Sequence, residues 1–114
     1  MIKELKEVIK ADVSDRELAD KYILKVDGKE VGFGYLFNRE TNPIEIFVLK
    51  EFQSNGYGKF LFGELLKVLK QGERLGVLFE VKDSDYRFRN IIMQAGAFEI
   101  GRNLPTIKYA LKLK

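Results

Sequence analysis

A short polar loop with two glycines, residues 53–58, separates an apolar strand from an amphipathic helix. The strand, 44–50, is almost continuously apolar, and the helix, 58–71, repeats leucines at helical spacing. The first N–H groups of a helix have no partner inside it, and the positive end of the helix dipole lies there. Glycines let a ligand approach the backbone closely. The segment therefore predicts an anion cradle at residues 53–58.

Composition limits the classes of function. The 114 residues suffice for one domain with a hydrophobic core, and the absence of cysteine and histidine excludes disulfides, imidazole catalysis and the usual zinc sites, so no metal is expected. No apolar run has the length of a membrane span, and the N-terminus lacks a signal-peptide core, which predicts a cytoplasmic protein without a membrane partner. A net charge of +3 suits a small anionic ligand and falls short of a nucleic-acid-binding surface.

The N-terminal segment is less clearly patterned. Residues 1–11 fit either a helix or an edge strand, and both remain open. Ser14 and Glu17 have the spacing of a capping box, in which each side chain bonds the other residue's backbone. This pattern predicts a short helix that ends near Lys21.

A hairpin is predicted next. Asp27-Gly28 separates two runs of strand-forming residues, 22–26 and 30–37, and this dipeptide favours a two-residue turn. Gly32 and Gly34 lie on one face of the second strand. We interpret them as marking a bend or bulge, with close packing on that face as the alternative.

The C-terminal half predicts a crossover. Residues 77–81 form a short β-branched and aromatic run, so this strand and strand 44–50 should lie parallel, joined by the helix in a right-handed connection. The remaining predicted elements are a helix capped by Asp83 or Ser84 and ended by Gly96, a strand at 97–101, a turn at 102–105, and a half-buried strand at 106–113. The sum is an α+β fold with a mostly antiparallel, mixed sheet and flanking helices.

The loop lacks the signatures of nucleotide-binding loops, both Gly-Lys-Ser/Thr and G-x-G-x-x-G. It resembles the acetyl-CoA loop of the GCN5-related N-acetyltransferase family, Arg/Gln-x-x-Gly-x-Gly/Ala, with Gln53, Gly56 and Gly58 at the defined positions. Val48 falls where the family has a valine at the end of its central strand, and residues 94–99 are similar to its helix-to-strand corner with one residue inserted. The resemblance covers about residues 20–114.

The resemblance implies a single acetyl-CoA-binding domain over residues 1–114, with three layers and a central parallel strand pair that splays into a cleft. It implies acetyl-CoA as cosubstrate and acetyl transfer to an amine of a small molecule or protein. The loop amides would hold the pyrophosphate, the strand edge would pair with the pantetheine arm, and the residue opening the last helix would also contact pantetheine. The implied cofactor-binding residues are Ile46, Phe47, Val48, Gln53, Ser54, Asn55, Gly56, Tyr57, Gly58 and Asp85.

The chain departs from the family at the catalytic positions. Ile92 stands where the family often has a general-acid tyrosine, and about Asn42 where it often has a glutamate base. The segment before residue 22 is shorter than the family's acceptor-binding region. Glu45 and Tyr86 are the remaining candidates for acid–base work, and a surface role is favoured for each.

Three functions therefore stand: an N-acetyltransferase, a non-catalytic acetyl-CoA-binding module, and an interaction domain in which the loop is only a turn. The acceptor amine is unidentified, and both a monomer and a homodimer fit the sequence.

Overall fold

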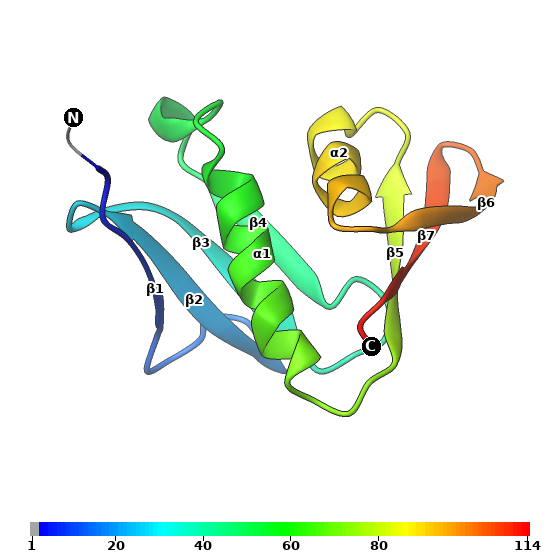
Figure 1. Cartoon of the computed structure of the whole chain (residues 1–114), viewed down its shortest axis with the longest axis horizontal. Coiled ribbons are helices and arrows are strands. Elements are labelled where there is room, and N and C mark those ends of the chain that lie inside the picture. Colours follow the sequence, from blue (N-terminus) through cyan, green and yellow to red (C-terminus); the bar gives the residue numbers. More distant parts are fainter. Residues whose placement is uncertain (1–2) are drawn as a thin grey trace. The chain divides into compact units, whose positions relative to one another are not determined.

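The computed structural model describes residues 3–114, which form two antiparallel β-sheets and two α-helices (Figure 1). One sheet has the strand order β1-β2-β3-β4, and the other has the order β5-β7-β6. The elements are β1 (Lys6–Lys10), β2 (Ala19–Val26), β3 (Lys29–Phe37), β4 (Ile44–Val48), the short 3₁₀ helix η1 (Lys50–Phe52), α1 (Tyr57–Lys70), β5 (Gly76–Lys82), α2 (Tyr86–Gln94), β6 (Phe98–Asn103) and β7 (Thr106–Lys112).

The chain divides into two compact units. The first contains the chain up to Asn38 together with Ile44–Leu66, and the second contains Arg39–Pro43 together with Lys67–Lys114. The predicted anion loop and β4 therefore both belong to the first unit. The candidates Asp85 and Tyr86, and the buried Ile92, belong to the second.

The predicted hairpin is confirmed in the first unit. Asp27 and Gly28 form its turn with φ angles of +53° and +80°, and β2 pairs with β3 on either side. The N-terminal segment, left open between helix and strand, is the edge strand β1, which pairs with β2. Asp27 helps to hold it, because its carboxylate accepts a hydrogen bond from the Leu5 N–H at 2.9 Å.

The short helix predicted after Ser14 is wrong. Ser14 Oγ accepts a hydrogen bond from the Arg16 N–H at 3.2 Å and so closes a local turn, as Ser and Thr side chains often do. The residues that a helix would need next begin β2, and Ala19 already pairs with Phe37. The cross-strand ladder, which a local pattern does not reveal, thus prevails over the capping signal.

The glycines of β3 serve close packing. A Cβ atom on Gly34 would lie 2.8 Å from Leu65 Cδ1 of α1, and one on Gly32 would lie 2.6 Å from the Phe47 carbonyl oxygen of β4. A bulge is present as well, where the β2–β3 register shifts beyond Leu24. Figure 1 shows α1, in green, crossing this sheet. Gly34 leaves room for α1, whose Leu61 and Leu65 are fully buried, and packing the helix this tightly buries apolar area.

The parallel pairing predicted for strands 44–50 and 77–81 is wrong. Within the described chain β4 pairs with β3 and β5 pairs with β7, and both ladders are antiparallel. Before β4 there is one isolated parallel bridge, between Thr41 and Leu78. Here the Asn42 N–H donates to the Leu78 carbonyl at 2.8 Å. Asn42 has a left-handed φ of +51°, and the proline that follows it has no N–H, so the parallel ladder ends there.

In the second unit, α2 begins later than predicted. Asp85, rather than Asp83 or Ser84, is its N-cap, and the Asp85 carboxylate accepts a hydrogen bond from the Phe88 N–H at 3.2 Å. Gly96 follows the helix with a φ of +108°, in agreement with its predicted role at the helix end.

The C-terminal strands complete the second sheet. β6 runs further than predicted, to Asn103, so the turn before β7 is shorter than four residues. The alternation along β7 is confirmed, since Ile107, Tyr109 and Leu111 are buried. Neither helix in residues 3–114 has the length and hydrophobicity of a membrane-spanning segment.

Candidate functional site

The loop between β4 and α1 exposes a run of backbone N–H groups. Ser54 and Gly56 both adopt the left-handed conformation, with φ angles of +68° and +78°. The first backbone bond into α1 runs from the Phe60 N–H to the Gly56 carbonyl at 3.1 Å, so the amides of residues 54–59 have no partner within the described chain. Left-handed residues in such a turn direct successive N–H groups to a common side, which makes an anion-binding concavity.

Side chains of the loop hold its shape from within. Asn55 Nδ2 donates to the carbonyls of Phe52 and Gln53, at 3.0 and 3.3 Å, and Gln53 Nε2 donates to the Val48 carbonyl at 3.2 Å. These two predicted site residues thus bond backbone carbonyls, which leaves the amides of the loop to a ligand. The shape of the loop that was predicted to be an anion cradle is therefore held by the chain's own contacts.

Tyr57 anchors the start of α1. It is 7% exposed, and its hydroxyl donates a hydrogen bond to the Glu4 carboxylate, which raises the pKa of Tyr57 above its ordinary value. The side chain is therefore fixed in the protein, and only the Tyr57 backbone is available to a ligand.

β4 is an edge strand of its sheet, and its register determines which backbone groups are free. The Leu49 N–H donates to the Val31 carbonyl, so the alternate pair Phe47–Phe33 also exchanges hydrogen bonds with β3. The backbone groups of Ile46 and Val48 then point to the open edge, where the Val48 carbonyl already bonds Gln53 Nε2. Of the three predicted edge residues, Ile46 and Val48 can pair with an extended ligand.

Phe47 presents its side chain instead. The ring is 44% exposed and stacks on Phe33 with the ring centroids 5.1 Å apart. Any contribution of this predicted site residue to binding comes from the ring, because its backbone groups are used within the sheet.

No protein-family model matches the sequence, and no curated protein matches it. Solved structures match across most of the chain. A Bacillus subtilis acetyltransferase in complex with CoA superposes with a TM-score of 0.75 at 11% identity, over 95% of this chain and 99% of that one. The ribosomal-protein-S18-alanine N-acetyltransferase of Escherichia coli gives a TM-score of 0.67 at 18% identity, over 87% and 72%. The chain has the fold of the GCN5-related N-acetyltransferases.

A third match, a Bacillus anthracis protein assigned as a streptothricin acetyltransferase in complex with acetyl coenzyme A, has a TM-score of 0.68 at 18% identity. It covers 86% of this chain, which in turn spans 64% of that protein's length. Identities this low establish the fold alone. They agree with the acetyltransferase resemblance of the sequence and leave the ligand to be argued from this chain's own residues.

The position where GCN5-related acetyltransferases often carry a tyrosine is fully buried. Ile92 is 0% exposed in α2, and its hydrocarbon side chain has no proton to donate. Tyr86, at the start of the same helix, is 69% exposed, and the Arg89 guanidinium lies 5.7 Å from its ring centroid. The Asp85 carboxylate caps α2 as described above, so this predicted pantetheine contact has a structural role of its own.

Glu45, the other candidate for acid–base work, is already paired. Its carboxylate accepts a hydrogen bond from Arg16 Nη1 at 2.7 Å, and its side chain is 28% exposed. Asn42, near the family's glutamate position, has a structural role, because its Oδ1 accepts a hydrogen bond from the Glu80 N–H at 2.9 Å. Among the described residues, no three of Asp, Glu, His or Cys lie together as a metal site would require.

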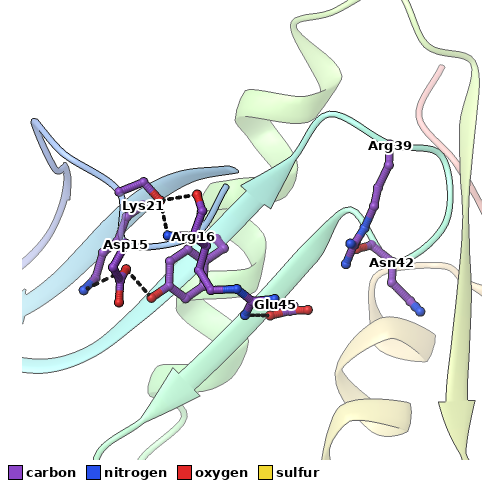
Figure 2. A network of polar contacts seen from close by, with 8 residues as sticks. Asp15, Arg16, Lys21, Arg39, Asn42 and Glu45 are labelled. Atoms are coloured by element: carbon purple, nitrogen blue, oxygen red, sulfur yellow. Dashed lines mark hydrogen bonds and ion pairs between the residues drawn. The ribbon is translucent and has the colours of Figure 1, made fainter. Parts of the chain in front are cut away.

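The structure adds a polar network that the sequence did not predict (Figure 2). The Tyr35 hydroxyl donates to Asp15 Oδ1 at 2.6 Å, and Lys21 Nζ lies 3.6 Å from the same oxygen. The alternation of β3 placed Tyr35 on one face of the strand, which was the available signal. Its partners, Asp15 and Arg16, could not be predicted, since the capping pattern at Ser14 predicts a helix in that segment.

The hydrogen bond between Tyr35 and Asp15 shifts the pKa values of its two partners in opposite directions. The hydrogen bond from Tyr35 lowers the pKa of Asp15, and the same bond to the carboxylate raises the pKa of Tyr35. A lowered carboxyl pKa stabilises the fold above the unfolded value of about 3.9, and this stabilisation is lost as the pH falls through the folded pKa. A raised phenol pKa stabilises the fold below the unfolded value of about 10, and this stabilisation is lost as the pH rises through the folded pKa.

The Tyr35→Phe variant tests this pH dependence. We expect the wild-type chain to be more stable than the variant at neutral pH, and the difference to shrink both in strong acid and above about pH 10. Urea unfolding of both proteins across the pH range measures it. A stability difference that stayed constant with pH would show that the Tyr35–Asp15 bond does not form in solution.

Proposed function

We propose that the chain binds acetyl-CoA and transfers its acetyl group to an amine. The observation that carries this proposal is the run of unpaired amides at residues 54–59, which opens α1 and includes the left-handed Ser54 and Gly56. Converging N–H groups and the positive end of the helix dipole favour a pyrophosphate at this place. The matched Bacillus subtilis structure, which contains CoA, supports the same ligand class.

The edge of β4 supplies the second half of the proposed binding site. A pantetheine arm carries amide groups in an extended chain, and such a chain can pair with an open strand edge as an added strand does. Ile46 offers its N–H and carbonyl there, and Val48 offers its N–H. The loop and the edge both belong to the first unit, so this part of the site is complete within it.

The proposed chemistry relies on positioning. The amine nitrogen attacks the thioester carbonyl carbon, the carbon–sulfur bond breaks, CoA leaves as a thiolate, and the ammonium proton passes to solvent. Holding the amine and the thioester together supplies much of such a rate without a protein acid. This suits a chain in which Ile92 replaces the tyrosine.

A second function is favoured by specific observations. Isoleucine occupies the family's tyrosine position and is buried, and the carboxylate of Glu45 is paired with Arg16, so neither of these two positions presents a free acid or base to a substrate. A module that binds acetyl-CoA without efficient transfer would have these features. It shares the cradle with the enzyme and differs in turnover.

Titration with acetyl-CoA tests the binding step. At about 100 times its Kd, the ligand is expected to add about 2.7 kcal/mol to the free energy of unfolding, measured as a rise in melting temperature. Absence of any rise at millimolar acetyl-CoA would refute both functions and favour an interaction domain whose loop is only a turn.

Release of free thiol separates the two functions. The enzyme is expected to release CoA faster when an amine is added, in a panel of polyamines, amino acids, aminoglycosides and peptides. Binding of acetyl-CoA with no amine-dependent release across that panel would favour the non-catalytic module.

A further inference from the structure

A guanidinium group already occupies a site on the face of the first sheet opposite α1. The Arg16 guanidinium carbon lies 5.2 Å from the ring centroid of Tyr35 and 5.1 Å from that of Phe37, and Arg16 Nη1 lies 2.7 Å from Glu45 Oε1 (Figure 2). Two aromatic faces and a carboxylate are the groups by which proteins recognise a guanidinium, through cation–π contact and a charge-assisted hydrogen bond. We call Tyr35, Phe37 and Glu45 the guanidinium site.

The site is built on rigid elements. Tyr35 and Glu45 are direct cross-strand partners in the β3–β4 ladder, and Phe37 is two residues further along β3, so the three side chains share one face. Tyr35 and Phe37 are 3% and 5% exposed. The sheet therefore fixes the backbone from which the three side chains project, and the Tyr35 hydroxyl also bonds Asp15.

The loop that brings Arg16 is weakly held. Residues 12–18, which we call the strap, expose their two large apolar side chains, Val13 at 80% and Leu18 at 88%. Leu18 also has a left-handed φ of +60°, which costs a non-glycine residue free energy. The strap therefore gains little from apolar burial, and its side-chain polar contacts with the sheet are those of Asp15 with Tyr35 and Lys21 and of Arg16 with Glu45.

We propose that the guanidinium site binds the guanidinium group of an external ligand, and that Arg16 occupies it in cis until such a ligand displaces the strap. The ligand is a basic compound or peptide that carries an alkyl guanidinium. The site shares β4 with the proposed pantetheine edge, but it uses the Glu45 side chain and none of the backbone groups of Ile46, Val48 or the 53–58 loop. Agmatine binding is therefore measured without acetyl-CoA and stands or falls separately from the proposed function.

The test titrates agmatine, a free alkyl guanidine, into the full chain and follows NMR shifts of the β3 amides. A ligand can bind only the fraction of molecules in which Arg16 has left the site, so Arg16 weakens the apparent affinity. The Arg16→Ala variant is therefore expected to bind agmatine at least about tenfold more tightly than wild type. Adding Glu45→Gln to that variant is expected to remove the gain. N-Butylurea, which has a similar shape and no charge, is expected not to bind.

A matched control comes from the second unit. Arg102 also pairs with a carboxylate, that of Glu99, at 2.7 Å, and within residues 3–114 no aromatic ring contacts this guanidinium. Arg102→Ala is expected to leave agmatine binding unchanged. Equal affinities of Arg16→Ala and wild type, retention of the gain in the double variant, or the same gain in Arg102→Ala would each overturn the proposal.

Two further arms complete the test. Arg16→Gln repeats the measurement if Arg16→Ala does not fold, as judged by circular dichroism. A capped arginine tripeptide is compared with agmatine in the same variant. Equal affinity for the two ligands identifies a guanidinium of any source as the ligand. Tighter binding of the tripeptide identifies an arginine-bearing peptide. If neither agmatine nor the tripeptide binds, the proposal is overturned.

Discussion

Gly56→Glu is expected to abolish acetyl-CoA binding. The glutamate side chain would stand at the centre of the 54–59 amides, where its charge repels the pyrophosphate and its volume blocks the approach. The ligand-induced gain of about 2.7 kcal/mol, expected for wild type at about 100 times the Kd, should disappear. Thermal shift with and without acetyl-CoA measures the loss.

The fold should survive this change at a modest cost, because a Cβ atom at Gly56 meets no other atom within 4 Å. Its φ of +78° still makes any side chain strained, by about 1–2 kcal/mol. Gly28→Glu is the matched control, since Gly28 has a φ of +80° and equally open surroundings in the hairpin turn. It should lose similar stability and keep acetyl-CoA binding. Unchanged affinity of Gly56→Glu would place the pyrophosphate elsewhere.

Gly32→Ala is expected to lower the free energy of unfolding by about 1–3 kcal/mol, as overpacking in a core does. The added Cβ would lie 2.6 Å from the Phe47 carbonyl oxygen, a backbone atom that cannot rotate away. β4 must therefore shift. Because Ile46 and Val48 offer the proposed pantetheine edge, the affinity for acetyl-CoA should fall as well.

Gly63→Ala controls for the loss of glycine itself. Gly63 lies inside α1, and a Cβ atom there meets nothing within 4 Å. Alanine is the better helix former by up to about 1 kcal/mol, so this variant should be more stable than wild type. Urea unfolding of both variants gives the comparison. Equal stabilities of Gly32→Ala and wild type would mean that β4 does not approach β3 this closely.

Features that depend on neighbouring residues were predictable. The hairpin at Asp27-Gly28, the helix through Leu61 and Leu65, and the alternation around Tyr109 each follow from side-chain periods or turn chemistry over a few residues. The loop 53–58 belongs to this group, because its glycines and the helix that follows stand next to one another in the chain.

Features that depend on distant partners were not predictable in the same way. The capping pattern at Ser14 and Glu17 was locally valid, yet β2 starts at Ala19 because it pairs with β3. The predicted parallel ladder is absent for a related reason, since β4 pairs with β3 and β5 pairs with β7. The pairing of Arg16 with Glu45 joins residues 29 apart, and no period in the sequence encodes it.

The sequence by itself determined that residues 53–58 form an anion-binding loop candidate at the start of a helix, because loop, glycines and helix are contiguous. Only the tertiary structure decided which groups remain available. The β3–β4 register leaves Ile46 and Val48 on an open edge, the core buries Ile92, and the strap places Arg16 against Glu45. Availability is a matter of what a group meets in space, and that depends on residues far away in the chain.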